Sequence, residues 1–113
     1  MSHSLERNES QALRELSLIL LNDAKNDDLK KIIITEVRIK NDLSVMSIYY
    51  TFYSGKKETY EKALNESKGF LRSALAKKLK LRKMPELVFI HDESLEYGNH
   101  IYDVLDKIKK EEN

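Results

Sequence analysis

Hydrophobic and polar residues alternate with two different periods in the first half of the chain. Between Leu5 and Leu21, apolar residues at 5, 12, 13, 16, 19 and 20 fall on one side of a helix, and charged residues lie on the opposite side. This spacing predicts an amphipathic helix. The polar stretch NDAKNDD at 22–28 then predicts a loop.

The next segment has the period of a β-strand. KIIITEVRIK at 31–40 is rich in β-branched residues and is followed, after Asn41-Asp42, by LSVMSIYYTFY. The Asn-Asp pair favours a tight turn, so the two segments predict an antiparallel hairpin. On the first strand the alternation separates two faces, Ile33, Thr35, Val37 and Ile39 on one and Ile32, Ile34, Glu36, Arg38 and Lys40 on the other. On the second strand we expect a core-facing set of Met46, Ile48, Tyr50 and Phe52.

The helical period returns after Ser54-Gly55. We expect one helical segment over Lys56–Glu66, an interruption at Gly69, and a second segment over Phe70–Lys80 that ends before Pro85. The inward positions of the two segments are Tyr60, Ala63 and Leu64, then Leu71, Ala74, Leu75 and Leu79.

The last part of the chain predicts one strand and one helix. ELVFI at 86–90 is a short apolar run, and a final helix is expected after it with Asp92 or Ser94 as its N-cap. The order is helix, strand, strand, helix, helix, strand, helix, without an internal repeat or a linker. We therefore expect one α+β domain over residues 1–113, with a three-stranded sheet packed against helices.

Positive charge is concentrated in one stretch. Ser67–Met84, called the basic segment below, holds seven Lys or Arg and no Asp or Glu, although the whole chain has a net charge of +1. Segregated charge of this kind attracts polyanions or acidic surfaces. A solvated helix face that pairs with acidic neighbours is the alternative interpretation, and composition leaves both open.

A helix from Lys68 to Lys80 would place much of this charge on one side. Arg72 and Lys80 would lie at i and i+8 of one row, and the small residues Ser73 and Ala76 would let a bulky partner approach. Such a row suits a phosphate backbone, since each neutralised phosphate releases counterions. Gly69 has two interpretations: a kink between packed helices, or a new helix start whose free N–H groups favour an anion.

Several other classes of chemistry lack the residues that they need. The chain has no Cys, and His3, His91 and His100 lack the i, i+4 spacing of a helical zinc site. Gly55-Lys56-Lys57 lacks the P-loop frame, and no nucleophile motif is present. No apolar run approaches the roughly 20 residues of a membrane span, and the N-terminus has no signal-peptide pattern. We expect a cytoplasmic protein that is not an enzyme and uses no metal, cofactor or small-molecule substrate.

Three tyrosines are candidates for stacking on bases. Tyr49 and Tyr53 could stack on bases, as aromatic residues do in RNA-binding modules, or could be ordinary exposed tyrosines of a sheet. Tyr60 is expected in the core.

Two stretches carry a family resemblance. TEVRIKNDLSVMSIYYT contributes a strand–turn–strand pattern through Val37, Asp42, Leu43, Ser44, Ile48 and Tyr49. The more specific stretch, ALNESKGFLRSALAKKLKLRKMPELVFIHDES, contributes Ala63-Leu64, Gly69-Phe70-Leu71-Arg72, Leu81-Arg82, Pro85-Glu86-Leu87, Phe89, Asp92 and Ser94. In this order the motifs resemble the bacterial ribosome-binding factor A family over nearly the whole chain.

The resemblance implies a KH-like domain of the second topological type. KH domains clamp single-stranded nucleotides with a GxxG loop between two helices. The family has an Ala-x-Gly kink at that place, and this chain has Ser67-Lys68-Gly69 there. We therefore expect a structural kink at Ser67 and Gly69, and binding through the basic helix face rather than through a clamp.

The resemblance also implies a function. Members bind the free small ribosomal subunit, assist late maturation of the 5′ end of 16S rRNA and support growth in the cold, without catalysis. We expect a monomer that contacts rRNA through Lys68, Arg72, Ser73, Lys77, Lys80, Arg82 and Lys83. The rival interpretation is a protein-interaction adaptor whose basic face docks on an acidic protein.

Overall fold

The computed structural model describes residues 2–22 and 25–92. Its elements, in chain order, are α1 (Ser2–Asn22), a 3-10 helix η1 (Leu29–Lys31), β1 (Ile32–Ile39), β2 (Val45–Phe52), α2 (Lys57–Ala76) and β3 (Glu86–His91). The predicted first helix, hairpin and third strand are confirmed. The predicted final helix lies outside the described residues.

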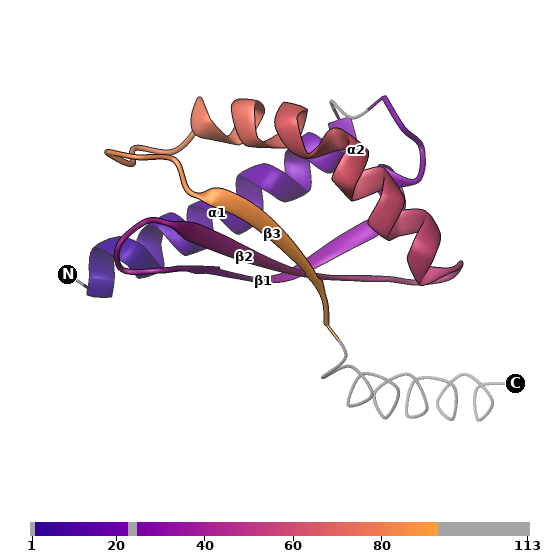
Figure 1. The fold of residues 1–113 in the computed structure, drawn as a ribbon, viewed down its shortest axis with the longest axis horizontal. Coiled ribbons are helices and arrows are strands. Elements are labelled where there is room, and N and C mark those ends of the chain that lie inside the picture. The colour runs from indigo at the N-terminus through magenta and orange to yellow at the C-terminus, as the bar shows by residue number, and fades with distance from the viewer. Residues whose placement is uncertain (1, 23–24, 93–113) are drawn as a thin grey trace, which may run out of the picture.

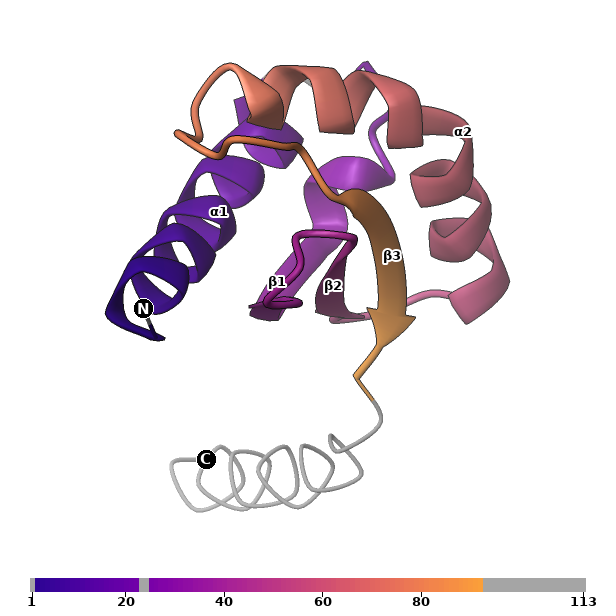
Figure 2. The ribbon, with the colours of Figure 1, turned by 60° about the vertical axis from the view of Figure 1, so that its left-hand side comes forward.

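The three strands form one sheet in the order β1-β2-β3. β1 and β2 pair antiparallel, whereas β2 and β3 pair parallel, and α2 makes the crossover between them. Figures 1 and 2 show α1 and α2 on the same face of this sheet. The core lies between these two layers, where the apolar stripes of both helices meet the inner face of the sheet, and its most buried side chains include Leu16, Leu20, Met46, Ile48, Leu64, Leu71, Leu75 and Leu87.

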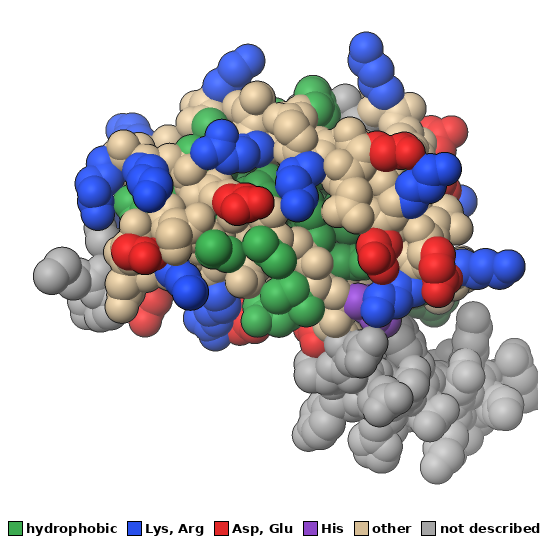
Figure 3. Space-filling model, in the orientation of Figure 1, with side chains coloured by type: hydrophobic (Ala, Val, Ile, Leu, Met, Phe, Trp, Pro, Cys, Tyr) green, Lys and Arg blue, Asp and Glu red, His purple; other side chains and the backbone are tan. Residues whose placement is uncertain are grey.

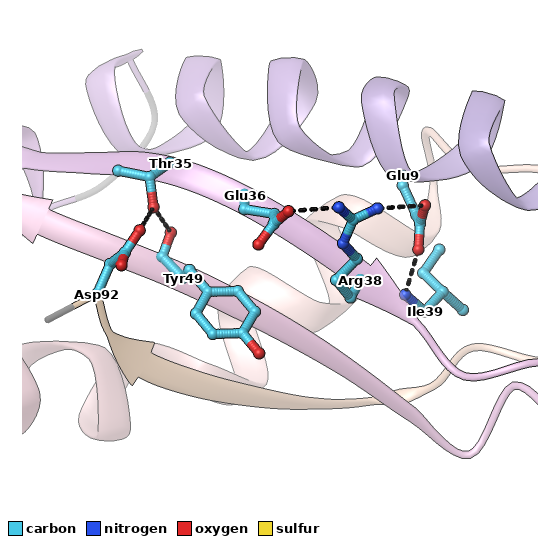
Figure 4. A network of polar contacts seen from close by, with 7 residues as sticks. All are labelled: Glu9, Thr35, Glu36, Arg38, Ile39, Tyr49 and Asp92. Carbon is cyan, nitrogen blue, oxygen red and sulfur yellow. Dashed lines mark hydrogen bonds and ion pairs between the residues drawn. The ribbon is translucent and has the colours of Figure 1, made fainter. Parts of the chain in front are cut away.

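The predicted unbroken alternation along β1 is wrong. The buried residues are Ile32, Ile34, Val37 and Ile39, because the pairing with β2 shifts between Ile34 and Glu36. One extra residue, Thr35, forms a bulge there, and an added residue reverses which side chains face the core. The Thr35 hydroxyl lies 2.7 Å from the Asp92 carboxylate and 3.2 Å from the Tyr49 carbonyl oxygen, so it ties the bulge to the end of β3 (Figure 4).

A side chain of α1 covers part of the free edge of β1. The Glu9 carboxylate accepts a hydrogen bond from the Ile39 backbone N–H at 2.7 Å. The same carboxylate lies 3.7 Å from the Arg38 guanidinium, which also pairs with Glu36 at 2.5 Å (Figure 4). Because an edge strand exposes unpaired backbone groups, this contact both blocks the edge and fixes α1 against the sheet.

The predicted turn between the first two strands is confirmed. The Leu43 N–H donates to the Lys40 carbonyl oxygen at 2.8 Å, and Leu43 has a left-handed backbone with φ 61°. Its side chain is buried, so the turn also contributes to the core. The Asp42 carboxylate accepts hydrogen bonds from the Ser44 N–H at 3.0 Å and from the Ser44 hydroxyl at 2.6 Å. These bonds hold the backbone of the turn.

The two predicted helical segments after Gly55 form one continuous helix, α2. The helix does not break at Gly69, so the interpretation of Gly69 as a new helix start with free N–H groups is wrong. α2 is bent, and its two halves run in different directions in Figures 1 and 2. Tyr60 is buried, as are almost all of the other predicted inward residues.

Candidate nucleic-acid interface

The basic segment divides between a helix and a loop. Lys68 and Arg72 lie on the second half of α2, which ends at Ala76. The expected helix as far as Lys80 is therefore wrong, and Lys80 does not extend the helical row of Arg72. Five of the basic residues lie at the end of the helix and in the loop that leads to β3: Lys77, Lys78, Lys80, Arg82 and Lys83.

Side-chain hydrogen bonds from both helices hold this loop. The Arg72 guanidinium donates through Nε to the Pro85 carbonyl oxygen at 3.1 Å and through Nη2 to the Met84 carbonyl oxygen at 2.6 Å. At the other end of the loop, the Gln11 amide of α1 donates to the Lys78 carbonyl oxygen at 2.8 Å. This bond gives a partner to a carbonyl group two residues beyond the end of α2 and fixes the start of the loop against α1.

Buried apolar residues anchor the same loop. Leu79 and Pro85 are buried, and Leu81 and Met84 pack partly against the core. Alternating with these anchors, Lys80, Arg82 and Lys83 are exposed. The apolar residues thus fix the path of the backbone, and the charged residues between them point to solvent. The sequence pattern KLKLRKM shows this alternation once the segment is known to lie outside the helix.

The second half of α2 and the loop form a positive surface. In Figure 3, Lys and Arg side chains gather over the loop at the upper left, with few Asp or Glu side chains among them. Among the ion pairs between described residues, none involves a residue of the basic segment. By contrast, Lys62 in the first half of α2 pairs with Glu66 at 4.0 Å. Lys68 and Arg72, like charges at i and i+4, repel each other, and a bound anion would relieve this repulsion.

The turn between β1 and β2 lies beside the basic loop. The Glu86 N–H donates to the Ser44 carbonyl oxygen at 3.1 Å, which joins the start of β3 to the turn. The Ser44 hydroxyl and N–H hold the pKa of Asp42 below its ordinary value, and the charges of Lys40 and Lys83 lower this pKa further. Lys40 and Lys83 therefore both lie near the Asp42 carboxylate, and the exposed Lys40 is a basic residue beside the loop that reasoning from the sequence left out because it belongs to another element.

The remaining predicted site residues differ in their exposure to solvent. Ser73 is exposed on α2, and Lys68 and Ser67 are half-buried. Gly69 is exposed, and a Cβ placed there would meet no atom within 4 Å. Of the tyrosines, Tyr60 is buried as predicted, Tyr49 is half-buried and Tyr53 is exposed. Phe70 is also exposed.

This surface can bind a chain of phosphates. Lys and Arg on a fixed backbone neutralise successive phosphates and release their counterions. Within the ranges that the structure describes, no three His, Cys, Asp or Glu side chains gather as a metal site would require. None of the helices in the same ranges is long and apolar enough to cross a membrane.

Comparisons with known proteins agree on one family. The family model of ribosome-binding factor A matches residues 4–105. Ribosome-binding factor A of Phytoplasma mali is 43% identical over 101 residues, which cover 86% of this chain and 89% of that protein.

Solved structures of the same family share the fold. The crystal structure of ribosome-binding factor A from Thermus thermophilus aligns with a TM-score of 0.69 and 26% identity, covering 77% of this chain and 94% of that one. The Thermus protein as fitted into a cryo-electron microscopy map of a 30S complex aligns with a TM-score of 0.61 and 26% identity, covering 73% of this chain and 88% of that one. These structures have the KH-like fold, so the predicted fold class is confirmed.

Proposed function

Because the chain belongs to the ribosome-binding factor A family, we propose that it binds the free small ribosomal subunit and assists its maturation. The proposed ligand is 16S rRNA, and the proposed step is late processing of the 5′ end of its precursor. The protein would act in the cytoplasm as a monomer, without catalysis, and would matter most in the cold.

The observation that carries this proposal is the fixed positive loop after α2. Lys80, Arg82 and Lys83 are exposed, have no ion pair with a described residue, and stand on a backbone held by Arg72 and by buried apolar side chains. A backbone held in advance loses little conformational freedom when it binds, which favours affinity. The Thermus relative fitted into a 30S complex supports the choice of partner.

The proposed mechanism is occupancy. A protein that binds one arrangement of an RNA more tightly than another shifts the population toward that arrangement by the difference in binding free energy. Held on immature rRNA, the protein would keep the segment near the precursor end in the conformation that processing requires. No bond is made or broken by the protein in this scheme.

Sedimentation with ribosomal particles tests the proposal. The purified protein is centrifuged with free small subunits, with large subunits and with joined ribosomes from the same bacterium. We expect it to pellet with free small subunits alone. Equal pelleting with large subunits, or none with small subunits, would refute it.

Deletion of the gene tests the finer claim. We expect small-subunit rRNA with an unprocessed 5′ end to accumulate, and to accumulate more strongly at low temperature. The chain with Lys80 and Lys83 changed to Glu should fail to restore processing. Full processing in the deletion strain at low temperature would leave binding intact as a function but would exclude a role in 5′ maturation.

The adaptor interpretation predicts different behaviour. An adaptor would bind an acidic protein through the same loop and would have no affinity for RNA above that of a generic basic protein. Titration with a fragment of 16S rRNA at several salt concentrations separates the two, since an RNA complex loses affinity along a steep log–log slope.

A further inference from the structure

An aromatic ring is exposed on the part of α2 that belongs to the basic segment. Phe70 has 48% of its surface accessible and lies on the side of the helix opposite to Lys68 and Arg72, which are each two residues away. The other exposed large aromatic side chain in the described part of the chain is Tyr53, which directly follows the last residue of β2. Neutralising phosphates requires no aromatic ring, so the charge of this surface does not account for Phe70.

The surroundings of Phe70 leave the ring accessible. The adjoining residue, Gly69, has no side chain, and a Cβ there would have open space around it. Ser73 and Lys77, at i+3 and i+7 from Phe70, are exposed on the same side of the helix. Over these seven residues the helix rises about 10 Å, so an aromatic face and a cation stand on one strip with only a small hydroxyl side chain between them.

We propose that Phe70 stacks on an unpaired base of a single-stranded RNA segment whose phosphates bind the basic segment. This inference rests on the proposed function and adds the class of RNA to it. Bases in a duplex already stack on one another, whereas an unpaired base offers a free face to an aromatic side chain. Stacking accepts every base, so Phe70 would select for single strands rather than for a sequence.

Phe70→Leu tests the role of the ring. The substitution keeps an apolar side chain on an exposed helix position and removes only the aromatic face. For a single-stranded RNA of roughly twelve nucleotides we expect affinity to fall about 5- to 150-fold, the range that loss of a stacked base produces. For a hairpin duplex with the same number of phosphates we expect less than about a twofold change. The salt slope should not change, because no charge is removed.

Tyr53→Leu is the control, since it removes another exposed ring, with 77% of its surface accessible, from a different part of the molecule. We expect it to change the affinity for either RNA less than about twofold. Equal losses for the two variants, or equal losses on single strand and duplex, would overturn the proposal.

A fluorescent variant gives a second, independent readout. The chain has no Trp, so Phe70→Trp introduces a single indole at the proposed contact. We expect its fluorescence to be quenched by single-stranded RNA and to remain unchanged with the duplex, and its RNA affinity to equal or exceed that of the wild type. Unchanged fluorescence at saturating single-stranded RNA would overturn the proposal.

These results separate this inference from the proposed function. If Phe70→Leu binds RNA normally while Lys80→Glu/Lys83→Glu does not, phosphate binding by the basic segment is supported and base stacking by Phe70 is excluded. If Phe70→Leu binds RNA normally but no longer sediments with small subunits, the ring contacts a ribosomal protein and the proposal is wrong. If the wild-type chain binds neither RNA nor the subunit, both proposals fail together.

Discussion

The guanidinium of Arg72 donates a hydrogen bond to the carbonyl oxygen of Pro85 at 3.1 Å. Together with the bond to Met84, this contact ties the second half of α2 to the residue that enters β3. Arg72 therefore holds the basic loop in place, and the proposed function adds a phosphate contact through its remaining N–H groups.

Arg72→Lys separates shape from charge at this position. Lysine keeps the positive charge but lacks the planar fork that reaches both carbonyl groups. We expect the free energy of unfolding, measured in urea, to fall by about 1 kcal/mol. We also expect RNA affinity to fall, because the loop is no longer held.

Arg82→Lys is the matched control for that substitution. Arg82 is exposed, and its guanidinium makes no hydrogen bond with the part of the chain that the structure describes. The control should leave both stability and RNA affinity nearly unchanged. Indistinguishable results for the two Arg→Lys variants would show that the Arg72 contacts hold nothing in solution.

Reversal of two charges in the loop should weaken RNA binding in a salt-dependent manner. If Lys80 and Lys83 each neutralise one phosphate, Lys80→Glu/Lys83→Glu should lower the slope of log affinity against log salt by about 1.4 for single-stranded RNA. The control, Lys25→Glu/Lys31→Glu, makes the same change of net charge in the connection before β1, at the opposite end of the molecule (Figure 1). An equal effect of both variants would mean that only net charge matters.

Removal of the Asp42 carboxylate should destabilise the protein at neutral pH but not in acid. Hydrogen bonds from Ser44 lower the pKa of Asp42 from its ordinary value of 3.8. A pKa that is lower in the folded than in the unfolded state stabilises the fold above the unfolded value, and this contribution disappears as pH falls through the folded value. We expect Asp42→Ala to have the lower urea midpoint at pH 7, and the difference from the wild type to shrink below about pH 3.8.

Asp42→Asn serves as the control for this pH dependence, since it keeps an acceptor oxygen and removes the charge. Its urea midpoint should lie between those of the wild type and Asp42→Ala at pH 7. A difference between wild type and Asp42→Ala that stays constant down to about pH 2 would exclude the carboxylate as the cause.

Gly69→Ala should stabilise the protein. Gly69 lies inside a continuous helix, its backbone has no positive φ, and a Cβ would meet nothing within 4 Å. Alanine in place of glycine within a helix stabilises by roughly 0.5–1 kcal/mol because the unfolded chain loses freedom. Urea denaturation measures the change, with Ser73→Ala on the same exposed side as a control of smaller effect. A loss of stability would show that the bend of α2 requires glycine.

Local periodicity determined most of the secondary structure of this protein. The apolar stripe of α1, the alternation in β2 and the inward positions of α2 follow from residues within a few positions of one another, so they can be read directly from the sequence. The +7 charge of the basic segment is likewise a property of composition. The family resemblance followed from motifs within residues 35–51 and 63–94.

Contacts between distant parts of the chain decided the rest. The bulge at Thr35 depends on Asp92 and reverses the faces of β1, although an unbroken alternation fitted the sequence equally well. α2 continues through Gly69 because its backbone needs no special conformation there, and it ends at Ala76, where the chain turns into a loop. The positions of Lys80, Arg82 and Lys83 depend on Arg72 and on buried neighbours. Charged residues can be counted along a sequence. The direction in which each charged side chain points depends on neighbouring side chains that pack only after the helices and strands have come together.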